Sequence, residues 1–78
     1  MSAKLVFLGR LADLAGASEL DVPGGALQDI LATLPAPLAL ALLDERVRFA
    51  LNGELVGERA LVLGDGDELA FLPPVSGG

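Results

Sequence analysis

Apolar side chains occupy both faces of the first and the last strand-like segments of the chain. Residues 4–8 read KLVFL and residues 68–72 read ELAFL, so side chains on opposite faces of each segment are apolar. Strands that are buried on both faces are typical of the interior of a sheet and of parallel pairing. The pattern therefore predicts two central, neighbouring and parallel strands.

Two intermediate segments alternate between polar and apolar residues. Residues 19–22 and 47–51 have this alternation, which predicts strands with one exposed face. The short connection between the first two strands favours antiparallel pairing. Asn52-Gly53 is a strong hairpin signal because both positions tolerate a positive φ, and residues 54–56 then return as a short strand.

The main helix is predicted at residues 27–34, where apolar residues recur at i, i+3, i+4 and i+7 before Pro35 ends the pattern. A shorter helical turn is expected at residues 10–15, followed by Gly16. Residues 38–43 are apolar throughout, so their periodicity does not fix their conformation. We interpret them as a short helical segment over the rim of the core.

The order strand, strand, helix, strand, strand predicts an α+β fold, with a mixed sheet of four to five strands and one main helix on one face. This is the β-grasp, or ubiquitin-like, architecture. We assign residues 1–72 to this domain and residues 73–78 to a flexible, extended C-terminal tail. The predicted core consists of Leu5, Phe7, Leu20, Leu27, Ile30, Leu31, Leu34, Phe49, Leu51, Leu69 and Phe71.

A single helical layer covers one face of the sheet, which leaves apolar side chains on the other face. The residues concerned are Val6, Leu8, Leu55, Ala70 and Leu72. Two explanations stay open. Either residues 38–43 or the loop before Gly64 folds over these side chains, or they form a patch that binds a partner, as exposed contiguous apolar surface usually does.

The composition fits one small domain, because the chain has 78 residues and 53% of them are hydrophobic. The absence of cysteine and histidine excludes disulfides and the usual zinc sites, and removes the commonest nucleophile and general base. The run Gly64-Asp65-Gly66-Asp67 lacks the remaining ligands of a calcium loop, so we interpret it as a turn. We therefore expect no metal site.

The formal net charge is −6, from eleven acidic and five basic residues. Phosphate binding requires clustered Lys and Arg, so this charge argues against a nucleic acid and favours a basic protein surface as partner. No signal peptide is evident, and the longest uncharged stretch, residues 30–43, is too short and too interrupted by prolines to span a membrane. We expect a cytoplasmic protein that does not bind a membrane.

The ending Pro73-Pro74-Val75-Ser76-Gly77-Gly78 is either a frayed terminus or the working part of the molecule. Two prolines favour an extended, stiff spacer, and two glycines can enter a channel too narrow for a side chain. A glycine carboxylate is an unhindered acyl group, but a separate enzyme must activate it, for example as an acyl-adenylate. Attack by a sulfur donor would then give a thiocarboxylate. The chain itself has no Walker-type phosphate loop.

Three segments together resemble the MoaD-type sulfur carriers, the small subunits of molybdopterin synthase. They are residues 4–16 (KLVFLGRLADLAG), Leu51-Asn52-Gly53, and residues 65–78 (DGDELAFLPPVSGG). A terminal Gly-Gly occurs in many ubiquitin-like proteins, whereas Pro-Pro-Val-Ser-Gly-Gly after the Asp-Gly-Asp turn is specific to this family. The resemblance covers the whole chain.

The resemblance implies a carrier that is not an enzyme on its own and binds no cofactor. Gly78 would be adenylated by an E1-like adenylyltransferase that uses ATP, and then thiocarboxylated. Pro73, Pro74, Val75, Ser76 and Gly77 would insert into the large synthase subunit, within a heterotetramer. There the sulfur would pass to cyclic pyranopterin monophosphate to build molybdopterin. Leu8, Leu55 and Leu72 match the positions that contact the partner, with leucine in place of larger aromatic groups.

Three other functions remain as alternatives. The first is a sulfur carrier for another pathway, such as thiamine or a sulfur amino acid. The second is a ubiquitin-like modifier joined through Gly78 to lysines of other proteins; Lys4 is the single lysine of this chain, which argues against extensive self-linked chains. The third is an interaction module with an idle tail.

Overall fold

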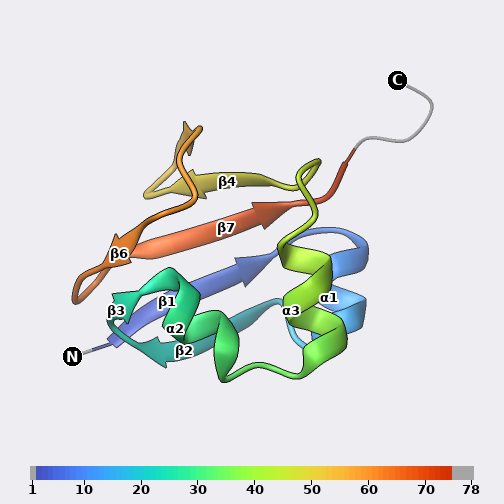
Figure 1. Ribbon diagram of the computed structural model, residues 1–78, viewed down its shortest axis with the longest axis horizontal. Helices are drawn as coiled ribbons and strands as arrows, with labels where there is room; N and C mark the ends of the chain where they lie inside the picture. The colour runs from blue at the N-terminus through green and yellow to red at the C-terminus, as the bar shows by residue number, and fades with distance from the viewer. Residues whose placement is uncertain (1, 75–78) are drawn as a thin grey trace.

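A mixed sheet and a layer of short helices form the body of the protein in the computed structural model, which describes residues 2–74. The elements within these residues are β1 (Ser2–Phe7), α1 (Arg10–Ala15), β2 (Glu19–Pro23), β3 (Gly25–Ala26), α2 (Leu27–Ala32), α3 (Ala36–Leu42), β4 (Arg48–Leu51), β5 (Glu54–Val56), β6 (Val62–Leu63) and β7 (Glu68–Leu72). The five-stranded sheet has the order β2-β1-β7-β4-β5, and β3 pairs separately with β6. Figure 1 shows the three helices on one side of the sheet.

The two segments that are apolar on both faces are the central strands, as predicted. β1 and β7 pair in parallel with Leu5 opposite Leu69 and Phe7 opposite Phe71. β2 pairs antiparallel with β1, and β4 pairs antiparallel with β7. The predicted α+β fold with a β-grasp sheet is therefore confirmed.

The three phenylalanines of the chain form one row across the helix-covered face. Phe7, Phe71 and Phe49 occupy opposing positions on β1, β7 and β4. The Phe7 and Phe71 rings stack with centroids 5.7 Å apart, and Phe49 meets Phe71 edge-on at 5.2 Å. Such offset and edge-to-face arrangements are favoured by the ring quadrupoles. This row lies in the core. Its middle member, Phe71, is followed in β7 by Leu72, the last residue of the strand.

The helical layer contains the predicted helix as α2, together with α1 at the expected helical turn and α3 at the segment interpreted as helical; α2 is no longer than the other two. α3 buries Leu38 and Leu42 in the same core as the phenylalanines, and α1 buries Leu11. The interpretation of residues 38–43 as a helical segment over the core is confirmed, with bounds at Ala36 and Leu42. The helices are short because Gly16 ends α1 and Pro35 separates α2 from α3.

Helix α2 ends at Ala32 rather than at the predicted Leu34. The Thr33 hydroxyl donates to the Ile30 carbonyl oxygen at 2.7 Å, and the Thr33 N–H donates to the same oxygen at 3.0 Å. Pro35 disfavours the helical region for the residue before it. Leu34 consequently lies half-buried at the edge of the core instead of inside it.

Two other predicted core residues are not buried. Leu20 is 38% exposed on β2, which is an edge strand of the sheet. Leu51 is half-buried at the open end of β4, next to the Asn52-Gly53 turn. The core also contains residues that the sequence pattern did not select: Ala3, Leu11, Val22, Leu38, Leu42, Val47 and Leu63.

The β3–β6 pair is absent from the predicted fold. Gly25 pairs with Leu63 and Ala26 with Val62, and the Leu27 N–H donates to the Leu61 carbonyl oxygen at 2.8 Å. Two-residue strands are too short to produce an alternating pattern. The pair holds the loop before Gly64 against the helical side of the molecule.

The two predicted turns are confirmed. Asn52 and Gly53 both have a positive φ, 51° and 86°, in the hairpin between β4 and β5. In the turn at residues 64–67, an Asp67 carboxylate oxygen accepts the Gly64 N–H at 2.8 Å and the other accepts from the Asn52 amide at 3.1 Å. These bonds lower the pKa of Asp67 below its usual value, the Gly64 bond being the larger cause.

Candidate functional site

One face of the sheet carries no helix, and we call its six apolar residues the outer face: Val6, Leu8, Ala50, Leu55, Ala70 and Leu72. The strand register places four of them in one row, with Val6 opposite Ala70, Ala70 opposite Ala50, and Ala50 opposite Leu55. Leu55 is 65% exposed at the end of this row.

Neither candidate cover lies over the outer face. α3 packs its buried leucines into the core on the helical side, and the loop before Gly64 pairs with β3. Within residues 2–74, the explanation that residues 38–43 or the loop before Gly64 cover these apolar side chains is therefore wrong. The outer face is a surface patch.

The partner residues expected from the sequence lie on this patch but not all side by side. Leu8 follows β1 and is 42% exposed, and its N–H donates to the Phe71 carbonyl oxygen at 3.2 Å. Because β1 and β7 are parallel neighbours, Leu8 lies beside Leu72, the last residue of β7. Leu55 is on β5, two strands away from β7, and it lies opposite Ala50 of the intervening strand β4. Leu8 and Leu72 thus border the origin of the tail, and Leu55 marks the far edge of the patch.

Charged residues flank the outer face. The Lys4 ammonium lies 3.5 Å from a Glu19 carboxylate oxygen, and Lys4 is opposite Glu68 in the register. Arg48 is opposite Leu72. The centre of the patch is therefore apolar and its borders carry both signs of charge.

Leu72, the last residue of β7, and Pro73-Pro74, the first residues of the expected tail, form a segment that we call the tail root. Figure 1 shows it at the end of the sheet where β7 finishes, away from the β3–β6 pair. Pro73 and Pro74 are half-buried. Val75, Ser76, Gly77 and Gly78 lie outside the described residues, so their expected roles stay predictions.

Two open grooves adjoin the tail root, and three of the five basic residues line them. A groove of about 590 Å³ contains Arg10, Arg46 and Pro74, and a second groove of about 540 Å³ contains Arg46, Arg48, Pro73 and Pro74. Acidic residues line them as well: Asp13, Asp44 and Glu45. The sequence does not reveal this grouping, because the arginines belong to α1, the α3–β4 connection and β4.

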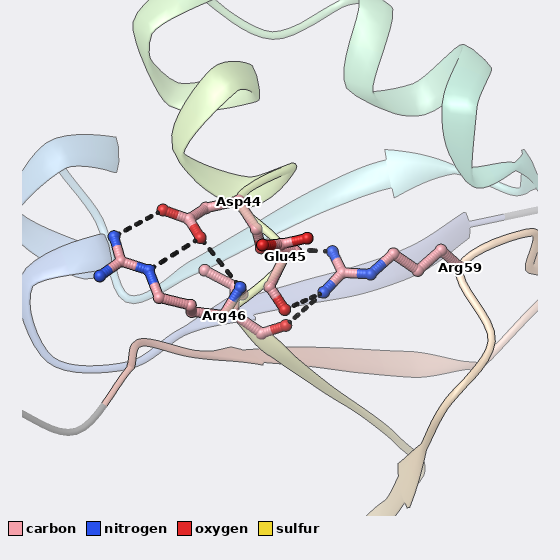
Figure 2. A network of polar contacts seen from close by, with 5 residues as sticks. Asp44, Glu45, Arg46 and Arg59 are labelled. Atoms are coloured by element: carbon pink, nitrogen blue, oxygen red, sulfur yellow. Dashed lines mark hydrogen bonds and ion pairs between the residues drawn. The ribbon is translucent and has the colours of Figure 1, made fainter. Parts of the chain in front are cut away.

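The α3–β4 connection is fixed by the polar network in Figure 2. One Asp44 carboxylate oxygen accepts from the Arg46 backbone N–H at 2.9 Å and from its Nε at 3.2 Å, while the other accepts from Nη2 at 3.0 Å. The Arg46 guanidinium is the main reason that the pKa of Asp44 is lowered from 3.8 to about 2, followed by the Arg46 backbone N–H. The Arg59 guanidinium donates to the Glu45 and Val47 carbonyl oxygens at 2.9 and 2.8 Å.

The described part of the chain combines an uncovered apolar face with the tail root. Within residues 2–74, no three His, Cys, Asp or Glu side chains gather as a metal-binding group. None of the helices in these residues is long and apolar enough to cross a membrane. The arrangement presents an apolar face across the sheet and holds Pro73 and Pro74 at the end of β7.

The comparisons with known proteins agree with this architecture. The sequence model of the ThiS family matches residues 5–78. The molybdopterin synthase sulfur carrier subunit of Escherichia coli (strain K12) is 36% identical over 81 aligned positions, which cover 96% of this chain and 98% of the relative.

Solved structures show the same fold. Small archaeal modifier protein 1 of Haloferax volcanii has a TM-score of 0.75 and 30% identity, with both chains covered completely. Subunit 1 of the molybdopterin-converting factor of Helicobacter pylori 26695, solved as a complex of subunits 1 and 2, has a TM-score of 0.67 and 26% identity over 100% of both chains. Because the family match and the Escherichia coli relative both span nearly the whole chain, this protein belongs to the ThiS family, among its MoaD-type β-grasp members.

Proposed function

We propose that the chain is the sulfur carrier, and small subunit, of a molybdopterin synthase. The observation that carries this proposal is the near full-length identity with the Escherichia coli sulfur carrier subunit. The ending Pro-Pro-Val-Ser-Gly-Gly supports it, because the family match extends to residue 78.

The reactive group is the carboxylate of Gly78. A carboxylate oxygen attacks the α-phosphorus of ATP in an E1-like adenylyltransferase, which forms a glycyl adenylate and releases pyrophosphate. Hydrosulfide then displaces AMP and forms a thiocarboxylate. Its sulfur passes to cyclic pyranopterin monophosphate, and hydrolysis of the acyl–sulfur bond returns the Gly78 carboxylate. The chain has no histidine or cysteine to assist these steps, so the partner enzymes supply the catalysis and the chain is no enzyme by itself.

The large synthase subunit docks on the outer face while the tail enters its active site. The Helicobacter pylori protein was solved in a complex of the two subunits of its factor, which supports such a partner. Leu8, Leu55 and Leu72 supply apolar contact, and burying a leucine side chain contributes about 1.5–3 kcal/mol. Two carriers bound to a dimer of large subunits give a heterotetramer. The site of action is the cytoplasm.

A role as a protein modifier is the second candidate, favoured by the likeness to small archaeal modifier protein 1. It would use the same adenylate but transfer Gly78 to a lysine amine of another protein. The Lys4 side chain is 41% exposed and paired with Glu19, and Lys4 is the one lysine of the sequence available for self-linkage.

Intact-mass analysis separates these functions. The purified chain is incubated with its activating enzyme, ATP and a sulfide source, with and without a protein extract. A carrier gains the mass difference of sulfur for oxygen at Gly78, and the thiocarboxylated chain then yields molybdopterin when large subunit and cyclic pyranopterin monophosphate are added. Conjugates with other proteins and no sulfur gain would establish the modifier. A thiocarboxylate that yields no molybdopterin would assign the chain to another sulfur pathway.

A further inference from the structure

The ring of Pro73 lies directly against Gly9 in the turn between β1 and α1. A Cβ atom placed on Gly9 would lie 3.1 Å from Pro73 Cγ and 3.9 Å from Pro73 Cδ. The first of these distances is tighter than nine in ten real Cβ contacts. Gly9 also has φ 56° and ψ −135°, a backbone conformation that residues with a side chain rarely adopt. The backbone at this position favours glycine, and a side chain here would press on the Pro73 ring.

The parallel pairing of β1 and β7 creates this contact. With Phe7 opposite Phe71, the next two residues of each chain segment run side by side, which brings Gly9 next to Pro73. The Leu8 N–H still donates to the Phe71 carbonyl oxygen at 3.2 Å. Proline has no N–H, so Pro73 cannot donate a further bond to the β1 side. Beyond Leu72, the direction of the tail root depends on the fixed φ of proline and on what its ring touches.

The Gly9 side of the contact is held firmly. The Leu11 N–H donates to the Leu8 carbonyl oxygen and the Ala12 N–H to the Gly9 carbonyl oxygen, both at 3.1 Å. Leu11 itself is buried in the core. The β1–α1 turn is thus held by hydrogen bonds and by the burial of Leu11, and the Pro73 ring packs against it.

We propose that Gly9 is a positioning residue for the C-terminal tail. By lacking a side chain, it lets Pro73 seat against the turn and so sets the direction in which residues 74–78 leave the sheet. This inference rests on the proposed function, since it matters only if Gly78 must reach a partner's active site. Five residues beyond Pro73 can reach at most about 16–18 Å, so a tilt of about 20° at the root can move the far end by up to about 6 Å.

Tail direction can be measured without any partner. The chain has no cysteine, so Val75→Cys accepts a single nitroxide spin label, which broadens the NMR signals of nearby backbone amides. We expect Gly9→Ala to change which amides are broadened. Gly16→Ala is the matched control, because Gly16 also has a positive φ of 78° but no atom within 4 Å of an added Cβ. An identical broadening pattern in the natural background and in Gly9→Ala overturns the proposal.

The consequence for function is measured as pyrophosphate release by the activating enzyme at varied carrier concentration. We expect Gly9→Ala to lower kcat/KM about tenfold, since small errors in position are costly for reacting groups, and Gly16→Ala to leave it unchanged. Gly9→Ala should lower kcat/KM less in a chain that also carries Pro73→Ala. In that chain the new methyl group no longer meets a proline ring. Equal losses in Gly9→Ala and Gly16→Ala, or a Gly9→Ala loss undiminished beside Pro73→Ala, would refute it.

The two proposals can fail separately. If the natural chain is not adenylated at all, the proposed function fails, and the spin-label experiment alone decides whether Gly9 directs the tail. If Gly9→Ala does not fold, Pro73→Ala alone removes the contact from the other side and leaves Gly9 unchanged. That variant must then change the pattern of broadened amides, and an unchanged pattern overturns the inference.

Discussion

The guanidinium carbon of Arg59 lies 4.7 Å from the centroid of the Phe49 ring, the outermost member of the phenylalanine row. The same guanidinium donates to the carbonyl oxygens of Glu45 and Val47, and more weakly to that of Asp44 at 3.4 Å (Figure 2). Arg59 belongs to the segment between β5 and β6, which lacks strand pairing. It therefore connects this segment both to the core and to the α3–β4 connection.

Replacing Arg59 by lysine should lower the free energy of unfolding by about 1–2 kcal/mol, because an ammonium can neither form the forked bonds nor stack flat on the ring. Chemical denaturation measures the change. Arg10→Lys on the exposed surface of α1 is the control, and it should change stability by less than about 0.5 kcal/mol. Equal effects would mean that the Arg59 contacts add no stability.

Leu42→Ala should cost about 2–5 kcal/mol of unfolding free energy, because it opens a cavity under α3. Leu42 is fully buried, whereas Leu40 in the same helix is 70% exposed. Leu40→Ala is thus a matched control with the same chemical change, and we expect a shift within about 0.5 kcal/mol. Similar denaturation midpoints for both variants would contradict the placement of α3 over the core.

Leu55→Asp and Leu8→Asp should each weaken binding of the large synthase subunit by roughly 10- to 100-fold, since each loses an apolar contact worth about 1.5–3 kcal/mol. Calorimetric titration measures the affinity, and thermal unfolding should be little changed. Leu40→Asp, on the opposite side of the molecule, should bind normally. Collapse of thermal stability in Leu8→Asp would show that Leu8 supports the core.

Asp44 should make the stability of the protein decrease as the pH falls below about 4. Its pKa is lowered from 3.8 to about 2 in the folded state, so its contribution is fully present above about pH 4 and is lost as the pH falls toward 2. Asp44→Asn removes the charge. The difference in melting temperature between the natural chain and this variant should be constant above pH 4 and decrease below it; a difference independent of pH would exclude the ion pair as its source.

Deletion of Gly78 should leave folding intact and abolish molybdopterin formation in an assay reconstituted with large subunit, activating enzyme, ATP and a sulfur donor. The reason is that the new terminal carboxylate falls one residue, about 3.3–3.6 Å, short of the reaction centre. Unfolding curves that match the natural chain are the control. Molybdopterin formation at the natural rate would refute the carrier mechanism.

The strand pairing of this protein is determined largely by local sequence. Two-sided apolar character placed β1 and β7 at the centre of the sheet, and Asn52-Gly53 specified the hairpin, because register and turn type follow from side-chain period and backbone freedom. The helices were less predictable. The continuous apolar run in α3 has no periodicity, and α2 ends before Thr33, which lies two residues before Pro35 and whose hydroxyl donates to the Ile30 carbonyl oxygen.

For the candidate site, the sequence by itself determined the identity of the tail and the apolar residues that face away from the helices. Only the tertiary structure decided that those residues stay uncovered, that arginines from three elements gather at the tail root, and that Gly9 meets Pro73. The physical reason is sequence distance. Residues 9 and 73 become neighbours because β1 and β7, from opposite ends of the chain, pair side by side in parallel. A local sequence pattern cannot predict such a contact.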